Sequence, residues 1–435
     1  MTRASGTIGT EEARASHAGV NSGTSTSPRF VLFLLFLIVT FNLLDRQIIN
    51  ILAQDIKDDL ALSDTELGLI TGTAFGILKA IVTIPIAWWA DRFDRARVLI
   101  ILLAISSAFT AVCGLANSYL ALAMARMGAG MGEGGGVPVA TALVRDHVPK
   151  RATSALALIM LGNPFGTLLA FLLGGLIAER WGWRTAFICA GLPGLMLAGL
   201  LCTKLKDIRA ERRAAAGSSA CALDVIRLLR RPRMTLLLGA TFASLFLVSA
   251  ANAWLPTILI RGHGLTTGRM GVYGAIAIGI GGGFGTLSGA LCDSVRSRVS
   301  YPESKLMLMT ITLAVPFLAL TIFGRTTGAA MLGFLVYNCV AYAWLAPTIR
   351  LIQDAAAVDD RALAIAVCSS VSTFLAVCIG IPLTGWISDL LTPQYGARSL
   401  GTAAFTTISA AAIVGLTSHS NFLVQIRRTD KKLQC

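Results

Sequence analysis

The stretch Phe41-Asn42-Leu43-Leu44-Asp45-Arg46-Gln47 places an acid beside a base inside an apolar run that extends over residues 30–53. A helix that spans a bilayer needs about 20 apolar residues, and this run is long enough. A charge near the middle of a span costs about 2.5–3.5 kcal/mol on insertion scales, so such charges are rare and usually line a cavity or a pathway. The stretch therefore predicts a transmembrane helix that carries functional charges within the membrane.

The composition extends this prediction to the whole chain. Its 435 residues are 55% hydrophobic and only 14% charged, and the mean hydropathy is +0.71. A soluble protein of this length needs far more polar surface, so the chain is predicted to cross the membrane many times. The net charge of +14 does not indicate nucleic-acid binding, because the basic residues lie in short loops between apolar runs.

Twelve apolar runs predict an all-α membrane protein with twelve transmembrane helices. They cover residues 30–53, 66–90, 98–116, 119–144, 152–178, 183–205, 234–260, 270–292, 305–325, 327–352, 361–388 and 399–424. Residues 1–29 are predicted to be a disordered tail, because they are polar and have no apolar periodicity. Ser63-Asp64-Thr65-Glu66 is predicted to form a capping box at the start of the second run.

The basic residues predict the orientation. If both ends are cytoplasmic, the cytoplasmic segments contain 27 Lys and Arg residues and the opposite side contains seven. This asymmetry predicts a multi-pass protein of the bacterial inner (cell) membrane with both termini in the cytoplasm. The linker 206–233 would contain a basic amphipathic helix on the membrane surface, and residues 425–435 would form a cytoplasmic tail.

The chain contains an internal repeat. Arg151 is followed 24 residues later by Gly175 and 28 later by Glu179, and the same intervals separate Arg361 from Gly385 and Asp389. The repeat predicts two six-helix pseudo-repeat bundles, over residues 30–205 and 234–424. Repeated halves of this kind are a transporter architecture with the binding site near the midplane.

A second charged stretch lies in the fourth run, at Arg126-Met127-Gly128-Ala129-Gly130-Met131-Gly132-Glu133. Arg126 and Glu133 are seven residues apart, so they share one helix face. We expect an Asp45–Arg126 ion pair, which proton binding to Asp45 would break, freeing Arg126 for an anionic group. The alternative is a structural salt bridge between the two helices. Buried pairs are weak evidence for stability, and this favours the functional interpretation.

Two further charges leave alternatives open. Glu133 is either a second proton site or a partner for Arg46 or Lys79. Lys79, just past the midplane, either reaches the cavity or extends toward the cytoplasmic interface, and we expect the second.

The second half has no ionisable residue deep within a span. Its candidates for contacting a substrate are polar and aromatic, and a cavity with charges on one wall and aromatic groups on the other suits an amphipathic anion. The candidates are Asn252, Trp254, Tyr337, Asn338, Tyr342 and Trp344.

Other chemistries are not indicated. The four histidines and nine cysteines show no metal-ligand spacing, so neither a metal nor a cofactor is predicted. Gly130-x-Gly132-x-x-Gly135 matches a dinucleotide pattern but has no preceding strand, and Gly281, Gly285 and Gly289 follow a helix-packing spacing, so both predict close helix contacts. Gly162-Asn163-Pro164 predicts a bend in the fifth span. No nucleophile–base pair is visible, so the protein is not predicted to be an enzyme.

The loop after the second span resembles a known signature. Asp91-Arg92-Phe93-Asp94-Arg95-Ala96-Arg97 is similar to the Gly-x-x-x-Asp-Arg-x-Gly-Arg loop of the major facilitator superfamily, with Ala87 and Asp94 in place of two glycines. It implies a cytoplasmic latch that includes Asp91, Arg92 and Arg95, and Asp293 occupies the repeat-related position. The alternative is a basic loop that only sets topology.

The first half resembles the bacterial Spinster-type branch of that superfamily. The resemblance rests on Asn42-x-x-Asp45-Arg46-Gln47, Leu62-Ser63-Asp64-Thr65-Glu66-Leu67-Gly68, Ala125-Arg126-x-Gly128-x-Gly130-x-Gly132-Glu133 and Trp181-Gly182-Trp183-Arg184, within residues 35–205. Animal members export lysolipids. The resemblance implies a monomer in which Asp45 couples to protons and Asn42, Arg46, Arg126 and Glu133 line the cavity.

The sequence thus predicts a proton-coupled transporter that works by alternating access and moves a lysolipid-like or other amphipathic anion. The same-class alternative is a transporter of small organic anions or drugs by the same proton relay. The alternatives of a different class are a non-transporting lipid receptor and a scramblase. A receptor would not need Asp45 to titrate, and a scramblase would ignore a pH gradient.

Overall fold

The computed structural model describes residues 28–134, 152–203, 230–357 and 360–434, together with positions 136, 139, 140, 143, 144, 227 and 228. Every element among these residues is helical. The helices are α2 (Pro28–Leu60), α3 (Asp64–Gly68), α4 (Phe75–Arg92), α5 (Arg95–Cys113), α6 (Tyr119–Glu133), α8 (Ala152–Met160), α9 (Gly162–Thr203), α12 (Pro232–His263), α13 (Thr267–Val295), α14 (Pro302–Phe323), α15 (Thr327–Ala341), α16 (Leu345–Ala355), α17 (Arg361–Thr373), α18 (Ile381–Tyr395) and α19 (Ser399–Gln434), with π segments η1 (Leu69–Ala74) and η5 (Phe374–Gly380) and 3₁₀ segments η3 (Tyr342–Trp344) and η6 (Gly396–Arg398).

Nine helical stretches of the described residues are long and apolar enough to cross a membrane. One stretch, Leu158–Thr203, joins the fifth and sixth predicted spans across Gly182, whose φ of 82° and ψ of 161° are not helical. Another, Leu363–Arg428, joins the last two across Gly396, where φ is 52°. The fourth predicted span lies partly outside the described residues. The all-α membrane class is confirmed, and the count of twelve stays a prediction.

Several local predictions are confirmed. Ser63 and Glu66 form the capping box at the start of α3. The fifth span bends where α8 ends at Met160 and α9 begins at Gly162. A Cβ on Gly130 would clash with the carbonyl of Phe75, and one on Gly285 would meet the carbonyl of Tyr342 at 2.6 Å. These glycines therefore allow close helix contacts, as their spacing predicts.

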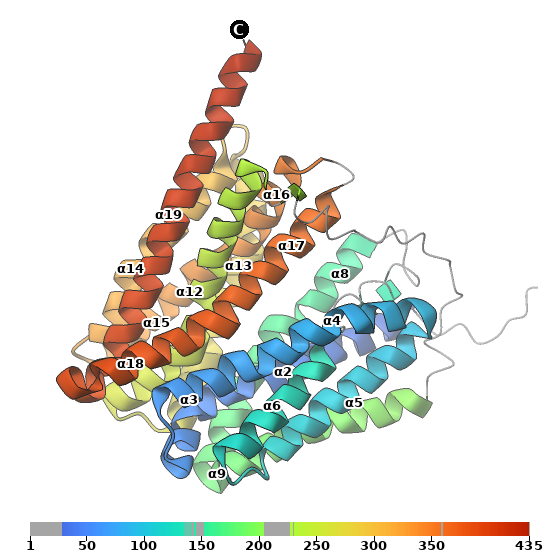
Figure 1. Cartoon of the computed structure of the whole chain (residues 1–435), viewed down its shortest axis with the longest axis vertical. Helices are drawn as coiled ribbons and strands as arrows, with labels where there is room; N and C mark the ends of the chain where they lie inside the picture. Colours follow the sequence, from blue (N-terminus) through green and yellow to red (C-terminus); the bar gives the residue numbers. More distant parts are fainter. Residues whose placement is uncertain are drawn as a thin grey trace, which may run out of the picture.

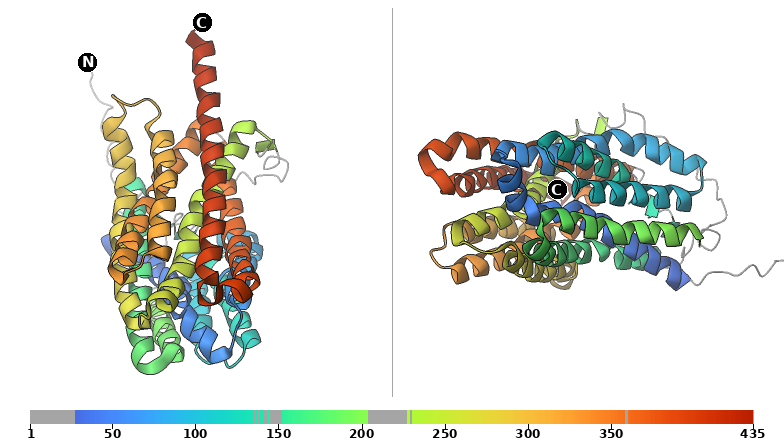
Figure 2. Two further views of the ribbon diagram at one scale, coloured as in Figure 1. Left: turned by 90° about the vertical axis from the view of Figure 1, so that its left-hand side faces the viewer. Right: turned by 90° about the horizontal axis from the view of Figure 1, so that it is seen from below.

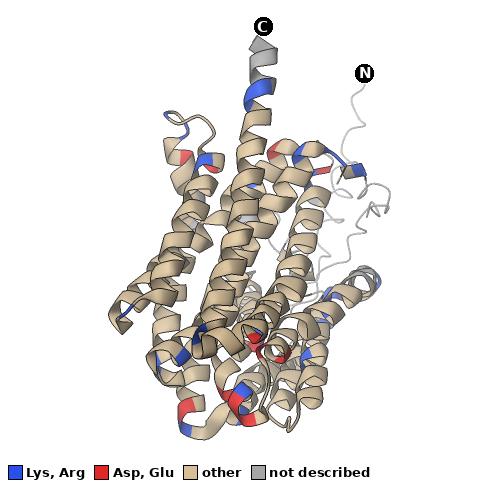
Figure 3. Ribbon diagram, turned by 60° about the vertical axis from the view of Figure 1, so that its left-hand side comes forward, with Lys and Arg blue, Asp and Glu red and all other residues tan. Residues whose placement is uncertain are grey.

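The chain ends and the linker are described only in part. Residues 1–27, 204–226 and 435 lie outside the described residues, so most of the predicted tail and linker does too. The predicted C-terminal tail is largely helical, because α19 continues to Gln434 and extends beyond its neighbours (Figure 2). Charged residues gather near the helix ends and leave long uncharged stretches between them (Figure 3), as expected of helices that cross a bilayer.

The helices before residue 204 and those after residue 229 diverge from a common corner, where α3 meets α18 (Figure 1). We call this corner the closed end, defined by Asp64, Arg261 and Asp389. Two glycines allow the backbones to meet there. A Cβ on Gly385 of α18 would clash with the Asp64 carbonyl, and one on Gly68 would meet Cα of Pro382 at 2.9 Å.

The two π segments pack against each other beside this corner. Thr73 of η1 donates a hydrogen bond from Oγ1 to the carbonyl of Cys378 in η5, at 2.6 Å. A Cβ on Gly72 would clash with the carbonyl of Val377. Thr71 beside this contact, and Val377 itself, line a central cavity, so the paired π segments help to form its wall.

Candidate functional site

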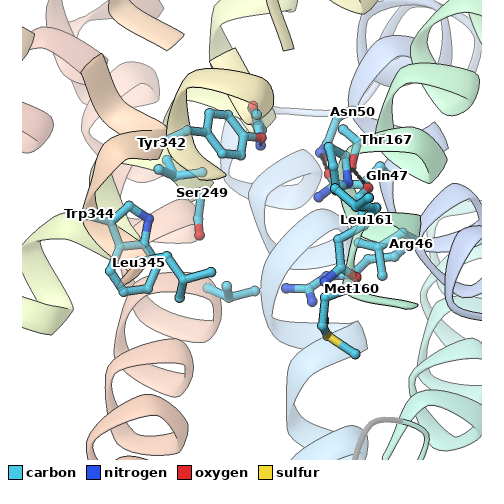
Figure 4. Close-up of a pocket in the computed structure, with 18 of the residues that line it drawn as sticks. Arg46, Gln47, Asn50, Met160, Leu161, Thr167, Ser249, Tyr342, Trp344 and Leu345 are labelled. Carbon is cyan, nitrogen blue, oxygen red and sulfur yellow. Dashed lines mark hydrogen bonds between the residues drawn. The ribbon is translucent and has the colours of Figure 1, made fainter. Parts of the chain in front are cut away.

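A cavity of about 520 Å³ lies between the two halves of the chain (Figure 4). Cavities of this size hold drug-sized molecules. Its described lining comes from α2, η1, α8, α9, α12, α13, η3, α16, η5 and α18, and includes Leu43, Arg46, Gln47, Asn50, Thr71, Met160, Leu161, Asn163, Pro164, Thr167, Val248, Ser249, Asn252, Gly282, Gly285, Tyr342, Trp344, Leu345, Ala346, Ile349, Val377 and Ile381.

The first-half wall is polar. Arg46, Gln47 and Asn50 follow one another on α2, and Asn50 Nδ2 donates to Gln47 Oε1 at 2.6 Å. Arg46 is the one Lys, Arg, Asp or Glu side chain in the described lining. An anionic ligand would therefore meet its charge on this wall.

The second-half wall is apolar and aromatic. Tyr342 and Trp344 belong to the 3₁₀ turn η3, which interrupts the span formed by α15 and α16. Figure 4 shows Tyr342 and Trp344 on the opposite side of the cavity from Arg46. Asn252 Nδ2 donates to the Tyr342 hydroxyl at 2.9 Å, which fixes the ring position. The predicted division into a charged and an aromatic wall is thus present. Of the predicted aromatic residues, Tyr342 and Trp344 line the cavity, whereas Tyr337 and Trp254 do not.

Arg46 belongs to a polar cluster, which we define as Asp45, Arg46, Lys79, Arg126 and Glu133. Of these five residues, only Arg46 is in the described cavity lining. Arg126 is fully buried. Its Nη1 donates to the backbone carbonyl of Asp45 at 3.3 Å and its Nη2 to that of Arg46 at 3.4 Å. The predicted Asp45–Arg126 ion pair is therefore wrong for this structure. The arginine binds the backbone of α2 instead of the carboxylate.

The Asp45 carboxylate points toward α5. Ser107 Oγ donates to Asp45 Oδ2 at 2.7 Å, and Asp45 is 1% exposed. Asp45 Oδ1 has no hydrogen-bond partner among the described residues. A buried carboxylate with one unpartnered oxygen and no ion pair within this part of the chain is a suitable place for a proton.

Lys79 does not extend to the interface, so that expectation is wrong. Its Nζ forms an ion pair with Glu133 Oε2 at 2.9 Å, and the Glu133 side chain is only 6% exposed. Of the alternatives for Glu133, the structure therefore selects Lys79 as its partner. Burial explains this outcome, because a buried carboxylate requires a nearby cation.

The three cations of the polar cluster lie around the aromatic ring of Phe75. The ring centroid is 4.8 Å from Cζ of Arg126, 5.5 Å from Cζ of Arg46 and 5.6 Å from Nζ of Lys79. Phe75 is the first residue of α4 after the π segment η1. The sequence does not predict this role of Phe75, because an apolar residue in an apolar helix gives no signal of contact with charge.

We expect Phe75→Leu to lower the stability of the protein by about 1–3 kcal/mol, through lost ring packing and lost cation–π contacts. Thermal unfolding in detergent, followed by tryptophan fluorescence, measures the change. Phe334→Leu is the matched control, at a buried phenylalanine of α15. Equal losses in the two variants would show that the ring contributes packing alone.

Other predicted substrate contacts lie away from the cavity. Tyr337 is fully buried and donates to the Leu247 carbonyl at 2.8 Å. Asn338 donates to the Phe334 carbonyl of its own helix at 2.8 Å. Asn42 of α2 is 8% exposed and is not in the cavity lining. The structure corrects all three predictions, because α15 turns Tyr337 toward α12 and Asn338 toward its own backbone, and Asn42 lies outside the cavity lining.

The predicted latch is only partly described. The side chain of Asp91 lies outside the described residues, while Arg92 ends α4 and Arg95 begins α5. Asp293, at the repeat-related position, forms ion pairs with Arg296 at 3.2 Å and with Arg350 at 3.5 Å. The role of these residues in gating stays a prediction.

The closed end contains a charged network that the sequence does not predict. Asp64, only 2% exposed, binds Arg261 through two hydrogen bonds of 2.8 and 3.1 Å. Asp64 Oδ1 also binds Lys57 Nζ at 2.5 Å. Asp389 accepts hydrogen bonds from the backbone amides of Asp64 and Thr65, at 3.0 and 2.8 Å. An acid at a helix N-terminus is stabilising, and this one joins the two halves of the chain.

The repeat gave a signal for this network. Asp389 is the acid of the second-half repeat, and Glu179 is its counterpart. The Glu179 carboxylate lies against Gly268 in the first turn of α13, where a Cβ would clash with it. Gly175 packs on the same turn, where a Cβ would meet the Thr267 carbonyl at 2.7 Å. Each repeat motif thus places a glycine and an acid on the start of a helix in the other half.

Comparisons with known proteins agree with this geometry. Residues 35–374 match the family model of the Major Facilitator Superfamily. A curated MFS-type efflux pump of Mycolicibacterium smegmatis is 32% identical, over 88% of this chain and 89% of its own. A 3-(3-hydroxy-phenyl)propionate transporter of Escherichia coli is 28% identical, over 72% and 76%. A crystal structure of a bacterial homolog of the human lysosomal transporter Spinster, inward-facing and unoccupied, matches with a TM-score of 0.78 and 22% identity, over 94% and 98%.

Proposed function

Because the chain belongs to the major facilitator superfamily, a family of membrane transporters rather than enzymes, we propose that it is a proton-coupled secondary transporter of an amphipathic organic anion. The observation that carries this proposal is the cavity itself. Arg46 presents the positive charge of its described lining on one wall, and Trp344 and Tyr342 form the opposite wall. The anionic group would meet Arg46 and the apolar body would lie against the rings.

Twelve spans in two six-helix bundles, with both termini in the cytoplasm of a bacterial cell, complete the proposal. The 27 to seven distribution of Lys and Arg supports this orientation. The closed end then faces outward, and the divergence of the helices away from it corresponds to an inward-facing state. Alternating access requires the closed end to open and the cytoplasmic ends to meet. The protein would do this as a monomer among the lipids.

A small organic acid with an aromatic or aliphatic body is the first substrate class. Curated relatives support this class, since one transports 3-(3-hydroxy-phenyl)propionate and another, of Pseudomonas putida, transports gallate. A lysolipid is the second class. It is favoured by the apolar side chains of Leu161 and Leu345, which line the cavity and are 44% and 51% exposed, because an acyl chain longer than the cavity can extend over them.

Asp45 is the proposed coupling site. Proton binding to Asp45 removes a negative charge next to Arg46, so it raises the affinity of the cavity for an anion. By linkage, a bound anion raises the affinity of Asp45 for a proton by the same factor. Binding of the anion is therefore expected to tighten as the pH falls. Glu133 is a second candidate, because its protonation would release Lys79.

The test is transport into proteoliposomes under an imposed pH gradient. Radiolabelled 3-phenylpropionate and a fluorescent lysolipid are the two probes, and Arg46→Gln is compared with wild type. The control Arg398→Gln removes the same charge from an exposed position in η6. We expect gradient-driven uptake of one probe, reduced about tenfold by Arg46→Gln and unchanged by the control, in line with a loss of about 1.4 kcal/mol of binding.

The other outcomes identify the alternatives. Movement of the lysolipid at the same rate with and without the gradient would indicate a scramblase. Binding without movement would indicate a receptor. Uptake that Arg46→Gln leaves intact would contradict the assignment of Arg46 to the anionic group.

A further inference from the structure

The three cations of the polar cluster differ in what they bind. Arg126 is held by the carbonyls of Asp45 and Arg46, and Lys79 by the carboxylate of Glu133. Arg46 has no ion pair within 4 Å among the described residues, and its guanidinium rests only on the Phe75 ring. Arg46, beside the cavity, is therefore the cation of the cluster that has no ion-pair or carbonyl partner among the described residues.

The groups that face Arg46 explain why its guanidinium has no ion-pair partner among the described residues. Arg126 and Glu133 come from α6, Phe75 and Lys79 from α4, and Cys378 approaches from η5, where its Sγ would clash with a Cβ on Gly76. Glu133 is the carboxylate in this set that can compete for Arg46, since the neighbouring Asp45 points to Ser107. The ion pair with Lys79 occupies Glu133.

We propose that Lys79 is a positioning residue, which neutralises Glu133 so that Arg46 alone is available to the substrate. This inference deepens the proposed function and rests on it. One cation without an ion-pair partner matches one anionic group, so the substrate is a monoanion. A second negative charge on the substrate would find no further Lys or Arg in the described lining, and an uncompensated charge in a buried site is strongly unfavourable.

Replacing Lys79 should cause Arg46 to form an ion pair with Glu133. In Lys79→Gln, Glu133 loses its counter-ion and captures Arg46, because Arg46 lies beside the same Phe75 ring as the Lys79 ammonium group that Glu133 binds. We expect the affinity for 3-phenylpropionate to fall about tenfold, or about 1.4 kcal/mol. Lys79→Arg keeps the ion pair and should bind as wild type. Lys79→Gln combined with Glu133→Gln removes the competing carboxylate and should restore the affinity.

Equilibrium binding to the purified protein in detergent measures these affinities. The neutral amide of the same acid is a second ligand, and the dianion phenylsuccinate a third. A positioning role weakens binding of the acid and leaves that of the amide unchanged, whereas general destabilisation weakens both. We expect wild type to bind the acid at least about tenfold more tightly than the dianion, equivalent to 1.4 kcal/mol.

The inference and the proposed function fail in different ways. If wild type binds neither the acid nor a lysolipid, the proposed anion site is wrong. If wild type binds the acid but Lys79→Gln binds it equally well, or the double variant fails to recover, the inference is overturned and the proposed function stands. Equal affinity for acid and dianion would overturn the assignment to monoanions.

Discussion

Replacing Asp45 with asparagine is expected to abolish gradient-driven accumulation of the substrate, a loss of more than about tenfold in the accumulation ratio, while exchange down the substrate gradient continues. The amide keeps the shape of the carboxyl group and can still accept the hydrogen bond from Ser107, but it cannot bind a proton that is released on the other side. Coupling between proton and anion would therefore be lost, while the cavity is preserved. Uptake with and without a pH gradient, in the same proteoliposomes, measures the effect.

The matched control is Asp58→Asn, at an exposed acid near the end of the same helix. It should behave as wild type. A second readout is the pH dependence of anion binding, which Asp45→Asn should flatten because protonation no longer changes the charge beside Arg46. An Asp45→Asn protein that still accumulates substrate with the gradient would move the coupling role to Glu133.

Replacing Arg261 with alanine is expected to open the closed end. Arg261 provides two of the hydrogen bonds to Asp64, which is 2% exposed. Asp64 keeps Lys57 as a partner, so losing the Arg261–Asp64 ion pair should cost less than the about 3–5 kcal/mol that follows when a buried charge is left with no partner. Since this pair joins α12 to α3, the loss falls mainly on the state in which these helices touch. The state in which the closed end is shut should therefore become less populated.

Hydrogen exchange followed by mass spectrometry measures this opening. The backbone amides of Asp64 and Thr65, which donate to Asp389, should exchange faster in Arg261→Ala. Arg184→Ala is the matched control. It removes an arginine–aspartate pair with Asp59 near the same end, which is partly exposed and lies within the first half. Such pairs contribute about 0–1 kcal/mol. Equal changes in the two variants would show that Arg261 does not hold the halves together.

The sequence predicted the elements that follow from a single stretch of chain. Apolar runs of sufficient length predict spanning helices, and the capping box at Ser63 and the bend at Gly162 depend on a few neighbouring residues. Arg46 on a cavity wall was predicted because a charge inside a span needs a polar environment. Each of these predictions rests on a local property.

The incorrect predictions about charged residues concern which partner each charge selects. Seven residues of separation place Arg126 and Glu133 on one face of α6, but they do not show that Arg126 turns to the α2 carbonyls and Glu133 to Lys79. That choice depends on the close contact between Gly130 and Phe75, which are 55 positions apart in the chain. The closed-end network was missed for the same reason, since Asp64 and Asp389 are 325 positions apart.

The paired π segments η1 and η5 have a consequence for mutational tolerance. A π turn accommodates one residue more than the α-helix around it, so deleting one residue from η1 would restore regular α geometry and leave the flanking helices in phase, whereas a deletion from a regular α-helix rotates everything beyond it by about 100°. Phe75, the first residue after η1, would then keep its alignment with the three cations. Single-residue deletions within 69–74 or 374–380 should therefore be tolerated better than deletions from the α-helical turns on either side. The two π segments are places where these spans can lose a residue without changing the direction in which their side chains point.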